Sequence, residues 1–394
     1  MNELKNIVII NDFDYVQGGA SKVAIETANL LSDKYNVYFF SGDSSSKSTL
    51  NNNVIKICTN QGECLKNKNK LIGSLNGIYN FKAKNMLKKI LKKLNNNETI
   101  IHVHGWTKCL SSSIFDMCWK MKFKVVLTLH DYFTACPNGG YFNYKKNEIC
   151  ELNPLSLKCL KCNCDSRSYI FKAYRIVRQF FQNKIIRLND RLTDVITISE
   201  FSEKILRKTL NPKTKIHRVY NPIDLDKTAK KVDYIKNKYY LYVGRISKEK
   251  GVDLFCEAIT NTGQKGIVVG DGPEKEMLEQ KYSKIKFVGW KNASDVKKYM
   301  KNSKALIIPS RWYEAAPLTP LEALQYGIPI ITSSCNATID YLNTKNGESF
   351  NIKNKELEVI IINFSKKYEP GLKIKCNYYK NILYTYNKIL NGGK

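Results

Sequence analysis

Residues Ala305–Ala323 read ALIIPSRWYEAAPLTPLEA, and this stretch decides the fold. The apolar run Ala305–Ile308 is short and ends at a Pro-Ser pair, which is typical of a buried parallel strand. Two prolines then favour a loop and a helix start, because proline lacks the N–H group that a first helical turn leaves unpaired. Glu314 is therefore predicted in the loop beyond the strand, and Glu322 in the first turn of a helix. Ligands bind at that edge of an open α/β sheet.

Two carboxylates at this edge can serve a ligand. Free N–H groups and the helix dipole suit an anion such as a diphosphate. A carboxylate beside them accepts hydrogen bonds from a pair of hydroxyls, such as a ribose or a hexose offers. The simpler interpretation is that Glu322 only complements the helix dipole and that Glu314 is solvated. The pattern alone leaves both interpretations open.

A second group of motifs lies upstream, where a strand predicted at Tyr239–Val243 runs into a glycine turn and then a helix at Val252–Ile259. Gly244 permits a close approach of the backbone to a ligand. Arg245 offers a planar fork of donors that matches phosphate, and Lys250 adds a point charge five positions on. Two further strands that end in glycine turns are predicted at Gly266–Pro273 and Ile285–Trp290.

In order and spacing, the motifs from Tyr239 to Pro329 resemble the nucleotide-sugar-binding domain of the retaining glycosyltransferases of family 4. That family has the α/β GT-B architecture, in which two Rossmann-like domains face each other across a cleft. The resemblance covers nearly the whole chain. One departure is Ala315-Ala316-Pro317, where many members carry Gly-Phe-Gly, so the donor sugar and base stay open. Matching motifs in the first half are Gly18-Gly19-Ala20, Leu127–Asp131, Ile196–Ser202 and Tyr220–Asp224.

The resemblance implies roles residue by residue. Arg245 and Lys250 would neutralise the leaving diphosphate, Glu322 would hold the ribose hydroxyls, and Glu314 would contact the donor sugar. His130, at the end of a strand, resembles the residue that faces the donor sugar across the cleft. His130 and Glu314 are therefore the implied catalytic residues. The implied donor-binding set is completed by Gly18, Gly19, Gly272 and Leu318.

Retention in this family is explained by front-face attack, in which the leaving phosphate receives the acceptor proton. No protein nucleophile and no catalytic cofactor is then required, because Arg245 and Lys250 supply the positive charge. The aspartate pairs at 12/14 and 224/226 do not lie with the phosphate-binding motifs, so we reject them as metal ligands. Elsewhere, His102 is predicted to pack in the core.

The chain of 394 residues is too long for one ordinary core, which predicts two domains. We expect an acceptor-side domain at 1–222, with a cysteine-rich insertion at 136–164, and a nucleotide-sugar-binding domain at 223–371. A helix at 372–394 is expected to cross back onto the first domain. Strands alternate with helices in the first half, which favours a parallel sheet. Its predicted strands are 7–10, 37–40, 54–57, 100–104, 125–130 and 195–199.

The composition limits where in the cell the protein can be expected. The chain is 43% hydrophobic and 25% charged, as expected of a globular protein. Its apolar runs fall short of the ~20 residues of a membrane helix. The first apolar run, Ile7–Ile10, is too short for a secretory signal. We therefore expect a cytoplasmic protein, whose 12 cysteines are not a disulfide framework.

The formal charge of +29 is the largest anomaly in composition, and it suits nucleic acid, an anionic membrane or anionic substrates. No nucleic-acid-binding motif is recognised, so no nucleic acid partner is expected. A basic nucleic-acid-binding protein and a nicotinamide dehydrogenase remain the alternatives from other classes. Against the dehydrogenase, the first strand is followed by Gly18-Gly19 and lacks the G-x-G-x-x-G pattern.

A cysteine cluster marks the irregular segment 136–164. Cys159 and Cys162 have zinc-knuckle spacing, and Cys136 and Cys150 complete four thiolates for a structural zinc. Free thiols in a cytosolic chain are an equally good interpretation, because only one such pair is present.

Two basic amphipathic segments occur in the first half. The segment 82–94 places an apolar stripe opposite Lys88, Lys89, Lys92 and Lys93. The segment 169–188 is predicted to pack Val177 and Ile185 inward. Its basic residues, expected on the outside, are Lys172, Arg175, Arg178, Lys184 and Arg187. Both segments are interpreted as helices packed on a sheet, whose charged rims can also contact an anionic bilayer.

The sequence thus predicts a glycosyltransferase at the inner face of the cell membrane. It would transfer a hexosyl or N-acetylhexosaminyl group from a UDP- or GDP-linked donor to a glycan hydroxyl. The basic charge favours a polyprenyl-diphosphate-linked acceptor and a role in surface polysaccharide assembly, such as O-antigen, capsule or exopolysaccharide. A soluble or protein acceptor is the alternative.

Overall fold

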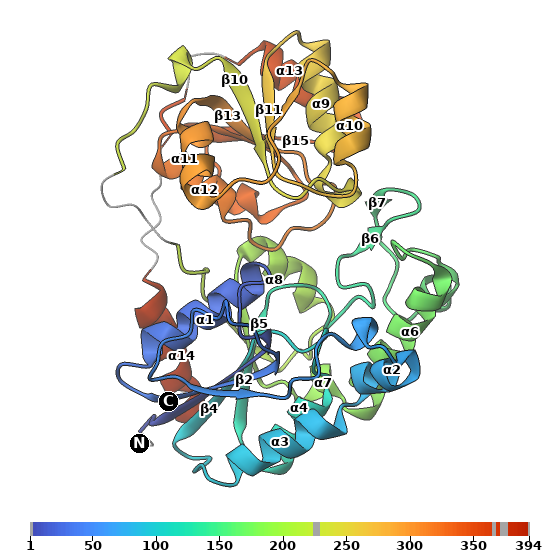
Figure 1. Ribbon diagram of the computed structural model, residues 1–394, viewed down its shortest axis with the longest axis vertical. Coiled ribbons are helices and arrows are strands. Elements are labelled where there is room, and N and C mark those ends of the chain that lie inside the picture. The colour runs from blue at the N-terminus through green and yellow to red at the C-terminus, as the bar shows by residue number, and fades with distance from the viewer. Residues whose placement is uncertain (1–2, 224–228, 365–367, 371–376, 393–394) are drawn as a thin grey trace.

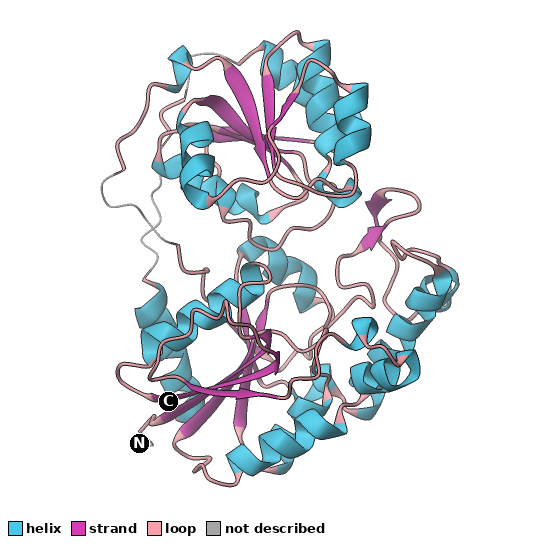
Figure 2. Cartoon of the chain, viewed as in Figure 1, coloured by secondary structure: helices cyan, strands magenta, loops and turns pink. Residues whose placement is uncertain are grey.

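The computed structural model describes residues 3–223, 229–364, 368–370 and 377–392. Within this part of the chain, two parallel β-sheets form separate α/β domains (Figure 1). Each sheet is enclosed by helices (Figure 2), which is the usual arrangement for parallel strands that are buried on both faces.

The first sheet has seven strands in the order β3-β2-β1-β4-β5-β8-β9. All eight residues of its interior strand β1 are buried, and alternate side chains enter separate cores on the two faces. Its strands are β1 (Asn6–Phe13), β2 (Asn36–Asp43), β3 (Ile55–Cys58), β4 (Thr99–Val103), β5 (Lys124–Leu129), β8 (Asp194–Thr197) and β9 (Lys215–Arg218). Six of these were predicted from sequence, whereas β9, which is short and polar, was not.

The helices of the first half lie on both faces of this sheet and along one side of it (Figure 1). Helix α14, which ends the described chain, packs here, because Tyr386 Oη lies 2.5 Å from His102 Nδ1 on β4. The prediction that His102 packs in the core is therefore confirmed. These helices are α1 (Gly19–Leu31), α2 (Lys70–Ile78), α3 (Phe81–Leu91), α4 (Ser113–Lys120), α5 (Leu157–Lys161), α6 (Tyr169–Phe180), α7 (Leu188–Arg191), α8 (Glu200–Arg207) and α14 (Tyr378–Leu390).

The second sheet has six strands in the order β12-β11-β10-β13-β14-β15. Its strands are β10 (Tyr239–Val243), β11 (Gly266–Val269), β12 (Lys286–Phe287), β13 (Ser303–Ile308), β14 (Ile330–Ser333) and β15 (Gly347–Phe350). Its helices are α9 (Val252–Asn261), α10 (Lys275–Lys281), α11 (Ala293–Lys301), α12 (Thr319–Gln325) and α13 (Glu356–Ile362). Glu314 follows β13 in a loop and Glu322 lies in the first turn of α12, which confirms both predicted placements.

The cysteine-rich insertion forms a hairpin of β6 (Phe142–Asn143) and β7 (Glu148–Ile149), followed by α5. The hairpin extends from the first domain toward the second (Figure 1).

The prediction for segment 169–188 is wrong in its orientation. Val177 and Ile185 are exposed, whereas Lys172 and Arg178 are only 1% and 7% exposed. The reason is that the polar face packs on irregular backbone, whose carbonyl groups accept hydrogen bonds from its side chains. Arg178, for example, donates to the carbonyl oxygens of Thr107 and Pro137, both at 3.3 Å. Arg175, another basic side chain that was expected on the outside, forms an ion pair with Asp165 at 2.8 Å and is also largely buried.

No helix in the described part of the chain is both long enough and apolar enough to cross a membrane.

Candidate active site

The C-terminal ends of β10, β11 and β13 and the start of α12 share one edge of the second sheet. The turn after β10 contains Gly244 and Arg245, and a short helix at Lys248–Lys250 follows it. The turn after β11 is pressed against that backbone. A Cβ atom at Gly270 would lie 1.8 Å from the Gly244 carbonyl oxygen, and both Gly270 and Gly272 have positive φ angles. Packing between two turns therefore requires these glycines.

Glu314 and Lys250 form an ion pair at this edge. The second carboxylate oxygen of Glu314 accepts a hydrogen bond from Ser310 Oγ at 2.7 Å. The Glu314 backbone is fixed on both sides, since its N–H donates to the Cys335 carbonyl at 3.3 Å and its carbonyl accepts from Ala337 at 2.9 Å. The structure thus brings together the predicted diphosphate-binding cation and the predicted sugar-binding carboxylate.

Glu322 and Arg245 take no part in this ion pair. The Glu322 side chain is half-buried, and no hydrogen bond or ion pair joins its carboxylate to any of the described residues. Arg245 is exposed. Leu318 is the residue that precedes α12. Glu322 and Arg245 therefore retain side-chain groups that can contact a ligand.

The first domain contributes His130, which directly follows β5. Its Nε2 atom lies 2.9 Å from His104 Nδ1, and the two rings stack. Burial lowers the pKa of His130 to about 3, so the imidazole is neutral near pH 7. His130 is therefore a neutral hydrogen-bonding group, and its contact with the donor sugar stays a prediction.

A cavity of about 370 Å³ joins Gly18, Gly19 and Asp131 of the first domain to Trp312 of the second. A Cβ atom at either glycine would meet no other atom within 4 Å, so open space lies beside this backbone. Burial raises the pKa of Asp131 to about 6. No function was predicted from the sequence for Asp131 or Trp312. The only signal for Asp131 was its position after His130, and none pointed to Trp312, which belongs to the other domain.

The loop that carries Glu314 is seated against the first domain. The Tyr313 ring contacts those of Tyr132 and Phe201, with centroids 6.2 and 5.8 Å apart. Ser199 Oγ donates to the Ala315 carbonyl oxygen at 2.5 Å. The Lys250–Glu314 pair is therefore held at the interface of the two domains, on the side that faces the β5 end.

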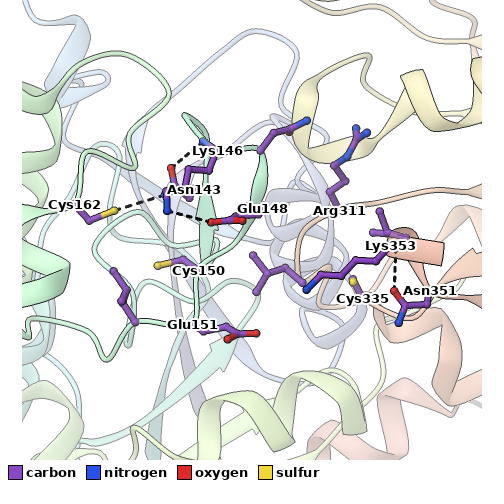
Figure 3. Close-up of a pocket in the computed structure, with 14 residues that line it drawn as sticks. Asn143, Lys146, Glu148, Cys150, Glu151, Cys162, Arg311, Cys335, Asn351 and Lys353 are labelled. Carbon is purple, nitrogen blue, oxygen red and sulfur yellow. Dashed lines mark hydrogen bonds and ion pairs between the residues drawn. The ribbon is translucent and has the colours of Figure 1, made fainter. Parts of the chain in front are cut away.

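A second cavity, of about 460 Å³, opens between the cysteine-rich insertion and the second domain (Figure 3). Glu148 and Cys150 line one wall, and Arg311, Cys335 and Lys353 line the other. Because the Cys335 carbonyl holds the Glu314 N–H group, this cavity adjoins the Glu314 loop. Its charged and uncharged polar groups suit a polar molecule with several hydroxyl groups, such as a sugar.

The predicted zinc ligands do not form a coordination group. In the described residues, no three His, Cys, Asp or Glu side chains are grouped as metal ligands are. Cys136 and Cys159 are buried, whereas Cys150 and Cys162 line the cavity of Figure 3. Lys172 Nζ donates to Cys159 Sγ at 3.6 Å. The zinc site stays a prediction that this geometry does not support.

The first aspartate pair has a structural role. Asp12 accepts three backbone N–H groups, from Lys108, Cys109 and Leu110, at 3.0, 2.8 and 3.1 Å. Asp14 accepts from Ser44 and Ser45. The second pair, at 224 and 226, lies outside the described residues.

The fold and this edge define a two-domain α/β protein with a site at the interface of its domains. Residues 17–227 match the family model described as Glycosyltransferase Family 4, and residues 226–367 match the model described as Glycosyl transferases group 1. The chain therefore belongs to glycosyltransferase family 4, which confirms the predicted family.

Solved structures match the whole chain. The lipopolysaccharide outer core galactosyltransferase WaaB has a TM-score of 0.58 at 18% identity, covering 99% of this chain and 100% of that one. HepE from Anabaena, in complex with UDP and glucose, has a TM-score of 0.61 at 14% identity, covering 98% of both chains. These likenesses confirm the predicted GT-B fold.

Curated relatives match over shorter segments. The lipopolysaccharide 1,6-galactosyltransferase of Salmonella typhimurium is 32% identical over 151 residues, which are 35% of this chain and 41% of that protein. The UDP-Gal:alpha-D-GlcNAc-diphosphoundecaprenol alpha-1,3-galactosyltransferase of Escherichia coli is 25% identical over 190 residues, which are 42% and 48% of the two chains. The chain thus spans less than half the length of these relatives.

Proposed function

We propose that this protein transfers a hexosyl or N-acetylhexosaminyl group from a UDP- or GDP-linked donor to a hydroxyl of a lipid-linked glycan, with retention at the anomeric carbon. The observation that carries the proposal is the Lys250–Glu314 pair, held by the interdomain contacts of Tyr313 and Ala315. The named relatives act in lipopolysaccharide and diphosphoundecaprenol-linked glycan synthesis, which supports a role in surface polysaccharide assembly.

Each side chain then has a chemical task. Lys250 and the exposed Arg245 neutralise the diphosphate as the bond from the anomeric carbon to phosphate oxygen breaks. Glu314 orients Lys250 and accepts hydrogen bonds from donor sugar hydroxyls. Glu322, whose carboxylate has no partner among the described residues, accepts the ribose hydroxyls. Neutral His130 hydrogen-bonds the sugar from the opposite domain.

The proton balance requires no protein nucleophile. The acceptor oxygen bonds to the anomeric carbon on the face from which the diphosphate leaves. The acceptor proton passes to the departing phosphate oxygen, whose developing charge Lys250 and Arg245 have stabilised. We expect the reaction to need no dissociable cofactor, because these two cations supply the charge.

The acceptor side is assigned to the cavity of Figure 3, beside the Glu314 loop. Its walls come from both domains, so the acceptor can bind there only while the two domains lie as close together as they do in this structure. We place the enzyme in the cytoplasm, at the inner face of the membrane, where polyprenyl-linked glycans and nucleotide sugars meet.

A panel of nucleotide sugars tests the proposal. Thermal shift with UDP- and GDP-linked hexoses and N-acetylhexosamines should select one donor, and mass spectrometry should then show transfer to a polyprenyl-diphosphate saccharide. Glu322→Ala serves as the matched variant, since it should lose the donor-induced shift. Stabilisation by no member of the panel would reject the proposed donor class.

A further inference from the structure

Helix α2 exposes its large apolar side chains to solvent. The side of the helix that packs on the protein is the one that carries its glycines. A Cβ atom at Gly77 would lie 1.8 Å from Tyr174 Oη of α6, and one at Gly73 would lie 2.2 Å from the Cys64 carbonyl oxygen. This close packing turns the opposite side of α2 outward. The side chains that face outward are Leu71, Ile72 and Leu75, with exposed fractions of 70%, 50% and 57%.

The same inversion continues in the neighbouring segments. Phe81, at the start of α3, is 66% exposed, and Ile185, in the π-helical turn 181–185 after α6, is 59% exposed. Helices α2, α3 and α6 lie together along one side of the first domain (Figure 1). Their apolar side chains line a groove of about 820 Å³ that includes Ile72, Leu75, Tyr79, Phe81, Phe181 and Ile185. A soluble domain rarely leaves such a contiguous apolar surface uncovered.

The surroundings of this groove are basic. Residues 61–94 contain nine lysines and a single acidic residue, Glu63, which pairs with Lys66. The acidic residue that lines the groove, Asp116, pairs with both Lys84 and Lys120. Lys68, Lys70 and Lys82 are exposed on the elements that form the groove, and Lys184 is exposed beside Ile185. A second copy of the chain would bring two lysine-rich rims together, which like-charge repulsion disfavours. An anionic bilayer offers the complementary surface, with negative headgroups above an apolar layer.

We propose that this groove is a membrane-docking surface that inserts into the interface of an anionic bilayer. Leu71, Leu75, Phe81 and Ile185 enter the boundary between headgroups and acyl chains, and the surrounding lysines contact the headgroups. The inference deepens the proposed action on a lipid-linked acceptor and rests on it. Among the basic residues expected at the bilayer from the sequence, Lys172, Arg175 and Arg178 are buried or paired. The lysines at 88, 89, 92, 93 and 184 are exposed, and their contact with the bilayer stays a prediction.

Vesicle sedimentation of the full chain tests the surface. Wild-type protein should bind vesicles of phosphatidylcholine with phosphatidylglycerol and be released by salt, because headgroup attraction decays over a Debye length of about 8 Å. The triple variant Leu75→Ser, Phe81→Ser, Ile185→Ser should bind about tenfold or more weakly, because it loses inserted apolar area. The matched control is Val359→Ser with Ile362→Ser, which removes comparably exposed apolar side chains from α13 and should bind as wild type.

Insertion is read out separately from headgroup attraction. In a Phe81→Trp variant, lipids brominated in the acyl chain should quench fluorescence more than in wild type. Equal binding of the triple variant and wild type, no vesicle binding by wild type, or a wild-type dimer that the triple variant dissociates would each overturn the inference. The stabilisation by the nucleotide sugar that the donor panel selects should stay unchanged in all these variants, so failure of the docking surface is distinguishable from failure of the proposed transferase function.

Discussion

Replacing Lys250 by alanine is the most informative perturbation of the proposed site. The side chain makes an ion pair with Glu314 and lies over the Trp312 ring, with Nζ 5.2 Å from the ring centroid. Both charged side chains are mostly shielded, with exposed fractions of 20% for Lys250 and 17% for Glu314. The variant removes the cation and leaves the Ser310 hydroxyl as a side-chain donor to the Glu314 carboxylate.

The expected loss of activity follows from this geometry. A preorganised charge donor in a shielded site contributes roughly 2–4 kcal/mol to transition-state stabilisation. That corresponds to a decrease in kcat of about 30- to 1,000-fold. The loss in stability should be smaller, about 1 kcal/mol, because the pair is neither fully exposed nor fully buried and Ser310 still donates to the carboxylate.

The assay is steady-state transfer with the donor selected by thermal shift, together with chemical unfolding of each variant. Lys248→Ala is the matched control, because Lys248 lies in the same short helix and is exposed. Glu314→Gln and the double variant complete a cycle that measures the coupling between the two side chains. The reasoning is refuted if Lys250→Ala retains activity within a few-fold of wild type, or if Lys248→Ala loses as much.

Three further predictions concern other side chains. Glu322→Ala should weaken binding of plain UDP or GDP, while Glu314→Ala should mainly lower turnover with intact donor; equal loss of nucleotide binding in calorimetry would contradict the assignment. Burial raises the pKa of Asp131 to about 6 from 3.8, so the folded state holds a proton that the unfolded state has released, and stability should fall as pH rises through this interval. Asp131→Asn should flatten the profile of Tm against pH between these values, and an unchanged profile would argue against the raised pKa. For the cysteine cluster, the zinc content of protein prepared without added zinc tests the predicted metal site. About one zinc per chain, and less in Cys159→Ser, would support it. Folded and active protein without metal would show that these cysteines are free thiols.

Much of the fold could be predicted because local patterns determine it. Buried parallel strands such as β1 and β13 are short apolar runs, and glycine or proline ends them in the sequence itself. The parallel order of the strands then fixes which loops share an edge, so Glu314 and Glu322 could be assigned to one rim. The edge strand β9 was missed because it is short and only partly buried, and its sequence carries no apolar run.

The candidate site was only partly predictable. Sequence assigned Lys250 to the diphosphate and Glu314 to the sugar, but their ion pair depends on how two loops fold against each other. Trp312 reaches a cavity of the first domain, and no pattern within one chain segment encodes a contact across an interface. The zinc prediction used the spacing of cysteines, whereas coordination requires that their sulfur atoms converge in space.

Sequence by itself determined the two α/β domains, the family, and the rim that carries Arg245, Lys250, Glu314 and Glu322, because these follow from periodicity, turn residues and motif order. Only the tertiary structure decided which faces of α2 and α6 are buried. A helical period shows that a helix has an apolar face and a polar face, but packing against neighbouring segments decides which of the two faces is buried. Glycines 73 and 77 let α2 pack through its small side chains, and Arg178 is buried where it donates to two loop carbonyl groups, so apolar side chains of both helices are left on the surface.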